Sequence, residues 1–161
     1  MGDPKRGKEI ASYIKKNFNP NLSILSIADG NLILAKELYH NYKVTVYDPD
    51  IRNNNRNVKS KIKIIGKIFT SDCKSKCDLI IGVHPDEATG EIIDYAIKNN
   101  TSCILIPCCV KGKYSSQCQN KHRWVKFLAN ILIQNGFRTS INYLPITGDK
   151  LLIKAIPNKK K

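Results

Sequence analysis

Carboxylates are scarce in this sequence, and one long stretch lacks them altogether. The 161 residues include 27 Lys and Arg against 13 Asp and Glu, a formal net charge of +14. Between Thr101 and Gly148 there are six basic residues and no acid, and residues 51–77 hold eight basic residues against Asp72 alone. Surfaces of this kind attract polyanions through phosphate contacts. Compositional drift is the alternative, because lysine outnumbers arginine 22 to 5, as an AT-rich genome would produce.

Long apolar runs are also missing. No run approaches the ~20 residues that a membrane span needs, and the first residues lack the apolar segment of a secretory signal. The opening MGDPKR does not fit the myristoylation pattern either, because Arg6 stands where Ser or Thr is required. We therefore expect a cytoplasmic protein with no membrane partner.

The C-x-x-C spacing of structural zinc sites is absent. The six cysteines, without a signal peptide, are expected to be reduced rather than bridged. Cys73 and Cys77 have three residues between them, as do Cys118 and His122, which is wider than the C-x-x-C knuckle of structural zinc sites. We expect scattered thiols and no metal site.

Internal repeats and long linkers are missing too, and the length suits a single core. We expect one domain over residues 1–157 and a basic tail at 158–161. Apolar periodicity predicts helices at 5–17, 32–40, 86–98 and 121–135, and strands at 22–28, 43–47, 61–65, 78–83, 102–106, 137–144 and 150–156. This alternation predicts an α/β fold: a doubly wound, mostly parallel sheet with a C-terminal antiparallel hairpin. Ligands of such sheets bind beyond the carboxyl ends of the strands, near the switch point.

The first two strand-end loops suit a nucleoside ligand. The first predicted strand runs into the turn IADGNL, where Gly30 lets a backbone approach a ligand. Asp48 ends the second strand 18 residues later, close to the ~20 expected of an acid that accepts hydrogen bonds from a ribose. A tight strand-to-helix turn and a surface turn DPD are the plainer interpretations.

With these features the chain resembles the class I S-adenosylmethionine-dependent methyltransferases over nearly its whole length, including the reversed last strand. Gly30 matches the central glycine of the family's first motif, whereas Ser26 replaces its acid, and Ala28 and Leu32 replace its other glycines. The resemblance implies S-adenosylmethionine as cofactor, bound by residues of four strand-end loops: Ala28, Asp29, Gly30, Asp48, Pro49, Ile68, Phe69 and His84.

The loop after the fourth strand reads HPDE, and the fifth strand ends in PCC. Together they resemble a poorly characterised methyltransferase-like subgroup and, more distantly, tRNA-modifying methyltransferases. HPDE is not the D/N-P-P-Y signature of amino-methylating enzymes. His84 suits a general base oriented by Asp86, although Pro85 and the two acids also suit a helix start. Cys108 suits a nucleophile or a small core residue.

The segment after PCC interleaves basic and aromatic residues, which can grip phosphates and stack on bases. Its candidate substrate-binding residues are Lys111, Lys113, Arg123 and Trp124. Trp124 suits a core anchor of its helix equally well. We expect a methyltransferase acting on RNA, either tRNA or rRNA, with a protein partner supplying specificity. A non-catalytic nucleic-acid-binding relative and a small-molecule methyltransferase remain the alternatives.

Overall fold

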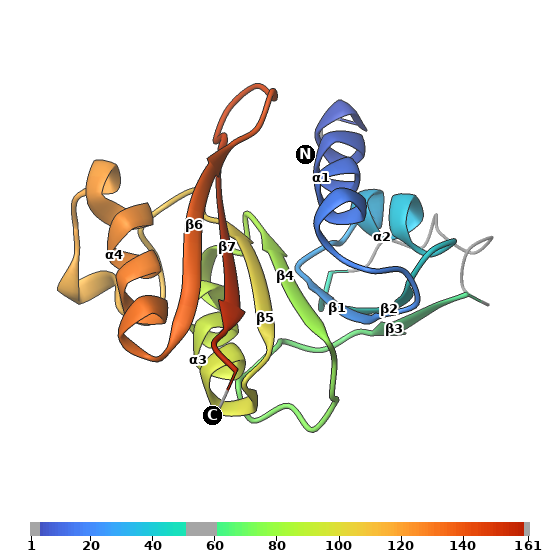
Figure 1. Cartoon of the computed structure of the whole chain (residues 1–161), viewed down its shortest axis with the longest axis horizontal. Helices are drawn as coiled ribbons and strands as arrows, with labels where there is room; N and C mark the ends of the chain where they lie inside the picture. The colour runs from blue at the N-terminus through green and yellow to red at the C-terminus, as the bar shows by residue number, and fades with distance from the viewer. Residues whose placement is uncertain (1–3, 51–60, 160–161) are drawn as a thin grey trace.

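The computed structural model describes residues 4–50 and 61–159, and part of the basic stretch at 51–77 therefore lies outside it, as does the end of the predicted tail. One seven-stranded sheet, ordered β3-β2-β1-β4-β5-β7-β6, forms the centre of the molecule (Figure 1). The strands are β1 (Ser23–Ile27), β2 (Lys43–Tyr47), β3 (Ile62–Ile65), β4 (Leu79–Val83), β5 (Ser102–Ile106), β6 (Phe137–Tyr143) and β7 (Leu151–Pro157). The helices are α1 (Pro4–Asn17), α2 (Ile33–Leu38), α3 (Thr89–Asn99) and α4 (Lys121–Gln134), with short 3-10 turns η2 (Asp86–Ala88) and η3 (Ser115–Gln117).

The first five strands are parallel, and β7 runs antiparallel to both β5 and β6. This confirms the predicted fold class. The chain leaves β1 towards one edge of the sheet through β2 and β3, then returns to place β4 on the other side of β1. The carboxyl ends of β1 and β4 therefore meet at the switch point, where crossovers lead away in opposite directions and leave a crevice.

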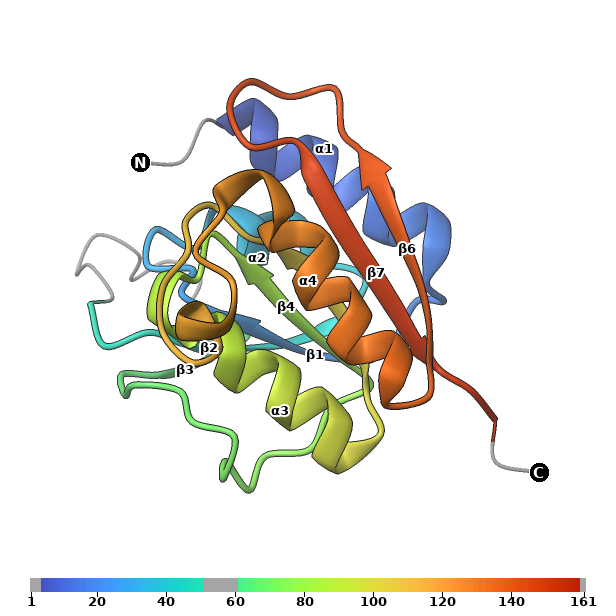
Figure 2. The same ribbon diagram turned by 90° about the vertical axis from the view of Figure 1, so that its left-hand side faces the viewer.

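Two apolar layers cover the sheet, because alternate residues of a strand point to opposite faces. In β4, Leu79 and Ile81 face the core layer under α1 and α2, whereas Ile80 faces the layer under α3 and α4. Figure 2 shows α3 and α4 in front of the sheet and α1 behind it. All three β4 residues are fully buried, which explains why the strand reads as an unbroken apolar run.

The helix predicted to begin at Asp86 begins later. Residues 86–88 form the 3-10 turn η2, and α3 starts at Thr89, whose hydroxyl donates to the Asp86 carbonyl oxygen across 2.8 Å. Asp86 itself has a φ of 50°, a left-handed conformation that most side chains avoid. Asp86 and Glu87 thus lie in the first turn of η2, as the helix-start interpretation expects, and the Asp86 carboxylate also accepts from two thiols.

The remaining boundaries agree with the prediction to within one or two residues, except that α2 is three residues shorter than the expected 32–40. Gly136, with a φ of 87°, follows the end of α4 as expected. The Asn120 side chain caps the start of α4 by accepting the backbone N–H of His122 across 2.9 Å. Among residues 4–50 and 61–159, none of the helices combines the length and apolarity needed to cross a membrane.

Candidate active site

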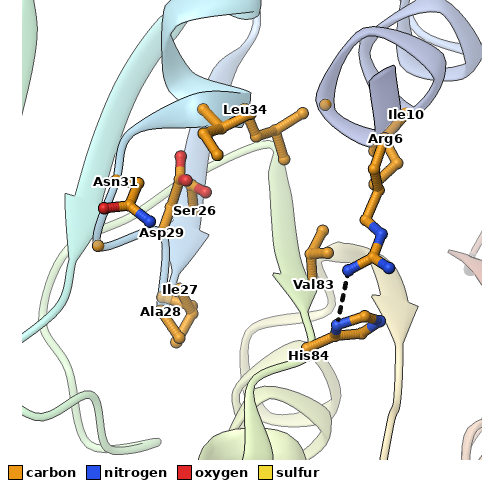
Figure 3. A pocket seen from close by; sticks show the side chains of 13 residues that line it. Arg6, Ile10, Ser26, Ile27, Ala28, Asp29, Asn31, Leu34, Val83 and His84 are labelled. Atoms are coloured by element: carbon orange, nitrogen blue, oxygen red, sulfur yellow. Dashed lines mark hydrogen bonds between the residues drawn. The ribbon is translucent and has the colours of Figure 1, made fainter. Parts of the chain in front are cut away.

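A cavity of about 200 Å³ opens at the switch point, between α1 and the carboxyl ends of β1 and β4 (Figure 3). The turn after β1 forms one wall, α1 and the start of α2 form another, and the end of β4 forms the third. Its lining residues are Arg6, Gly7, Ile10, Ser26, Ile27, Ala28, Asp29, Gly30, Asn31, Ile33, Leu34, Val83 and His84. The sequence-predicted residues Ala28, Asp29, Gly30 and His84 are thus brought together around one space.

The turn after β1 is tight and places Asp29 at the start of α2. Ala28 and Leu32 both have positive φ angles, of 64° and 54°. One carboxylate oxygen of Asp29 accepts the backbone N–H of Ala35 across 2.9 Å. Burial raises the pKa of Asp29, an effect that the backbone N–H groups of α2 oppose and the nearby charge of Asp48 reinforces. A cationic ligand group beside Asp29 would oppose this shift.

Asp48 lies next to the cavity, on the far side of Gly30. Its side chain is buried, and one oxygen accepts the Asp50 backbone N–H across 2.7 Å. A Cβ placed on Gly30 would stand 3.0 Å from the other Asp48 oxygen, so a glycine is what allows the turn and the acid to approach this closely. The predicted pairing of a glycine turn with a strand-end acid is therefore present, and Pro49 follows it as an exposed residue.

Arg6 is a lining residue that the sequence analysis missed. Its Nη1 donates to His84 Nδ1 across 3.1 Å, as Figure 3 shows, and its Nη2 donates to the Thr147 carbonyl oxygen across 3.0 Å. Arg6 thereby joins α1 to the β4 loop and to the β6–β7 turn. The sequence feature that could have identified Arg6 is its position one helical turn before Ile10, a buried residue of the amphipathic helix α1.

His84 is held from three sides. Its backbone N–H donates to the Ile106 carbonyl oxygen across 2.9 Å, and its φ is 50°. Because guanidinium nitrogens only donate, Nδ1 of the ring accepts and the proton belongs on Nε2, which lies 3.9 Å from an Asp149 oxygen. Burial and the Arg6 charge lower the pKa of His84, while Asp149 and Asp86 oppose that shift. The ring is neutral at pH 7, but its lone pair is engaged by Arg6.

Asp86, Cys108 and Cys109 meet beside this cavity. The Asp86 Oδ1 atom accepts from the Cys108 thiol across 3.0 Å and from the Cys109 thiol across 3.2 Å, and the two sulfurs are 3.3 Å apart. These hydrogen bonds lower the pKa of Asp86. Burial and the adjacent Asp86 raise the pKa of Cys108 to about 12. Cys108 is therefore protonated at neutral pH, and its role as a nucleophile stays a prediction.

Two predicted contacts need correction. Phe69 is only 3 % exposed, and its ring sits edge-on between Tyr47 and Tyr95 in the core, so it presents no face to an adenine. Ile68 beside it is 76 % exposed and stays available. Trp124 is 1 % exposed and packs against Phe127. The core alternative therefore holds for Trp124, and the predicted contact with a base does not.

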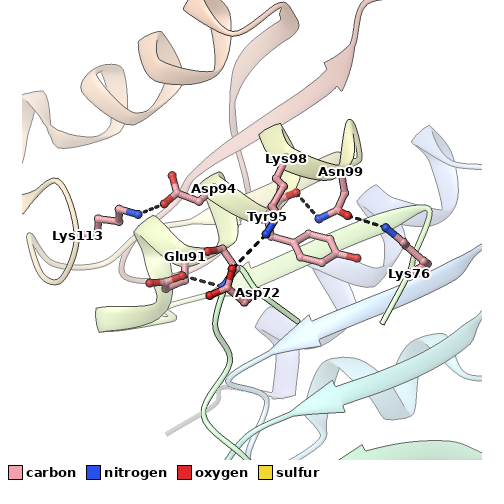
Figure 4. A network of polar contacts seen from close by, with 9 residues as sticks. Asp72, Lys76, Glu91, Asp94, Tyr95, Lys98, Asn99 and Lys113 are labelled. Carbon is pink, nitrogen blue, oxygen red and sulfur yellow. Dashed lines mark hydrogen bonds and ion pairs between the residues drawn. The ribbon is translucent and has the colours of Figure 1, made fainter. Parts of the chain in front are cut away.

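The three basic residues predicted to contact a substrate differ in whether they already have an ion-pair partner. Lys111 and Arg123 are exposed. Lys113 is exposed but forms an ion pair with Asp94 of α3, which raises the Lys113 pKa (Figure 4). Asp94 also accepts from the Tyr114 hydroxyl and so holds the middle of the segment between β5 and α4 against α3. Lys111 and Arg123 are thus better placed than Lys113 to meet a polyanion.

The sequence matches no protein-family model and no curated protein. Solved structures of similar fold are numerous. Magnesium protoporphyrin IX methyltransferase from Synechocystis PCC 6803 with bound SAH is 15 % identical, with a TM-score of 0.69 over 96 % of this chain and 83 % of that one. The precorrin-6y C5,15-methyltransferase of Geobacter metallireducens GS-15 is 13 % identical, with a TM-score of 0.65 over 98 % and 90 %. The 23S rRNA methyltransferase ErmE is 16 % identical, with a TM-score of 0.64 over 99 % and 70 %. The chain has the fold of the S-adenosylmethionine-dependent methyltransferases.

Proposed function

We propose that this protein is an S-adenosylmethionine-dependent methyltransferase that acts on RNA. The observation that carries the proposal is the cavity at the switch point, which presents a cationic and an acidic side chain on opposite walls, Arg6 and Asp29. An amino acid group carries one carboxylate and one ammonium. The two side chains therefore match the charges of the methionine end of the cofactor.

The size of the cavity agrees with binding one end of such a ligand. Its volume of about 200 Å³ is below the roughly 300–1,000 Å³ typical of pockets that enclose a whole small molecule. The nucleoside end would extend past Gly30 towards Asp48, whose buried carboxylate can accept from the ribose hydroxyls. Ile68 is the exposed apolar residue available to an adenine on that side.

The bound cofactor would supply a methyl group already activated by its sulfonium, so the protein's task is largely positioning. In this scheme the Arg6 guanidinium can bind either His84 or the carboxylate of the ligand. A ligand carboxylate would attract its guanidinium more strongly than a neutral imidazole does, and the turn of Arg6 towards the ligand would release His84 Nδ1. His84 could then accept a hydrogen bond from the substrate atom at the mouth of the cavity.

RNA is proposed because of charge. The net charge of +14 favours a polyanionic substrate, as do the exposed Lys111 on the segment after β5 and the exposed Arg123 at the start of α4. Neither residue reads a base by itself; both would position a backbone. A protein partner that supplies sequence specificity is part of the proposal.

Thermal unfolding with S-adenosylhomocysteine tests the cofactor. At a ligand concentration of 100 Kd, binding adds about 2.7 kcal/mol to the free energy of unfolding, which raises the Tm of a chain of this size by roughly 5–10 °C. Asp48→Ala should remove most of that rise, whereas Asp50→Ala, two positions along and exposed, should keep it. No Tm shift at millimolar ligand would favour the non-catalytic alternative.

A second experiment tests the substrate. Purified protein is incubated with total RNA and a methyl-labelled donor, and RNA binding is measured at 50 and 200 mM salt. A proposal of RNA as substrate requires labelled nucleosides and a binding constant that falls steeply with salt. A cofactor-dependent Tm shift accompanied by weak, salt-independent RNA binding would instead indicate a small-molecule methyltransferase.

A further inference from the structure

A second set of functional groups gathers next to the cavity without lining it. The Asp86 carboxylate and the Cys108 and Cys109 thiols offer one oxygen and two sulfurs, all within 4.8 Å of one another. They come from two loops that follow neighbouring strands, β4 and β5. The two more widely spaced pairs of the sequence, Cys73 with Cys77 and Cys118 with His122, do not join any such group of three in the described part of the chain.

We propose that Asp86, Cys108 and Cys109 form a binding site for a thiophilic divalent cation of the zinc type. Two thiolates and a carboxylate are ligands that Zn²⁺ takes readily. Three protein ligands leave the fourth tetrahedral position for a water molecule or a substrate atom, which is the pattern of reactive rather than purely structural zinc sites.

The distances suit this assignment after a small expansion. In a tetrahedral zinc site two sulfurs are about 3.8 Å apart and a sulfur and an oxygen about 3.5 Å apart, as follows from the usual bond lengths. The corresponding separations are 3.3 Å between the sulfurs, and 3.0 and 3.2 Å from the sulfurs to Asp86 Oδ1. Each must lengthen by only about 0.3–0.5 Å to accept the ion. All three side chains are partly exposed, so they have room to do so.

Close backbone packing holds the loop after β4 against the loop after β5. A Cβ placed on Gly112 would stand 2.5 Å from the Glu87 carbonyl oxygen, so the segment after Cys109 lies directly against η2. Gly112 also has a φ of 72°, which glycine adopts without strain. The left-handed conformation of Asp86 turns its carboxylate towards the thiols. Backbone packing therefore brings together the two loops that carry the ligand atoms.

Metal binding leaves the site with a small net charge. The two thiols release their protons to solvent, so two thiolates, one carboxylate and Zn²⁺ carry a net charge of −1. Lys111, two residues after Cys109, is the exposed cation whose charge already acts on Asp86. It would offset that remaining charge. A metal bound here would connect the β4 loop to the β5 loop two residues after His84, which lines the cavity.

Titration with Co²⁺ and Zn²⁺ alone tests the proposal, with the protein kept reduced by a phosphine that does not compete for metal. We expect one equivalent of Co²⁺ to give tetrahedral d–d bands and a sulfur-to-metal charge-transfer band with the intensity of two thiolates. Zn²⁺ should displace it. Cys108→Ser and Cys109→Ser should each weaken Zn²⁺ binding by at least about tenfold, the smallest loss usual even for outer-shell partners, and Asp86→Asn likewise.

The matched controls are Cys73→Ser and Cys118→Ser, which remove partly exposed thiols elsewhere and should leave binding unchanged. Circular dichroism checks that each variant is folded. The intensity of the charge-transfer band counts the thiolates in the unmodified protein, so this part of the test does not depend on any variant. Absence of saturable binding would refute the site, as would binding lost in a control variant or retained in the cluster variants. These readouts need no cofactor, so they do not depend on the proposed function.

Discussion

The Arg6 guanidinium and the His84 ring, 78 residues apart in the sequence, meet across 3.1 Å at the mouth of the cavity. One contact thus links the first helix to the loop after the fourth strand. The contact also occupies Nδ1 of His84, which is the acceptor nitrogen of the neutral ring. His84 would need this nitrogen to accept a proton.

Replacing Arg6 tests its part in cofactor binding. A hydrogen-bonded charge pair contributes about 1.5–3 kcal/mol, so Arg6→Gln should raise the Kd for S-adenosylhomocysteine by roughly 10- to 100-fold. Lys8→Gln, an exposed change on the same helix, is the matched control and should alter the Kd little. Isothermal titration calorimetry measures both. Equal affinities for the two variants would contradict a role for Arg6.

Neighbouring residues at the start of α4 should separate binding from stability. Arg123 is exposed, so Arg123→Ala should weaken RNA binding and reduce its salt dependence by about one phosphate contact without changing stability. Trp124 is fully buried, so Trp124→Ala should lower the free energy of unfolding by about 3–5 kcal/mol. Urea unfolding measures the stability of both variants, and filter binding measures their RNA affinity. A stable Trp124→Ala protein with poor RNA affinity would restore the original stacking prediction.

Two glycines with positive φ should respond unequally to alanine. Gly112→Ala meets both its left-handed backbone and the Glu87 carbonyl oxygen, so its cost should exceed the roughly 1–2 kcal/mol of backbone strain alone. Gly136→Ala has a φ of 87° and nothing within 4 Å of the new methyl group, so only the backbone cost applies. Urea denaturation gives the two free energies. A similar loss for both would mean that the Gly112 contact relaxes freely.

Stability should fall in alkaline solution partly because of Cys77. Burial raises the pKa of the Cys77 thiol from about 9 to about 11. Because the folded state holds its proton more tightly, this contribution is complete below pH 9 and is lost as the pH rises towards 11. The slope from one such group is at most about 1.4 kcal/mol per pH unit.

Cys77→Ser removes this titration and should flatten the slope between pH 9 and 11, as measured by urea unfolding at a series of pH values. Cys118→Ser is the control, and its slope should match that of the unmodified protein. An unchanged slope in Cys77→Ser would assign the alkaline loss to other groups, of which Tyr95, also raised in pKa by burial, is the nearest.

The sequence predicted the sheet well because burial is local. The apolar runs of β1, β4 and β5 are buried on both faces, and that alone makes them recognisable. The closeness of Gly30 and Asp48 was likewise predictable from spacing. Arg6 and Asp149 were not, because their contacts with His84 depend on how α1 and the β6–β7 turn pack from opposite ends of the chain.

Trp124 and Asp86 show two different limits of prediction from the sequence. Trp124 belongs to a row with Leu128 and Leu132, spaced by four and buried together, so helical periodicity could have identified it as core. Asp86 carried no such signal. Its direction follows from a φ of 50° that only the packed loop imposes, and an acid after a proline otherwise reads as a helix start.

The strand order has a consequence for synthesis of the protein. β7 comes last in the chain yet pairs between β5 and β6, so the edge of β5 has no partner until residue 157 has left the ribosome. The turn just before β7 also supplies the Thr147 carbonyl that holds Arg6 at the cavity. A nascent chain therefore gains the contact that holds Arg6 only after the β6–β7 turn has been made, and until β7 pairs it presents a bare strand edge of the kind that chaperones shield.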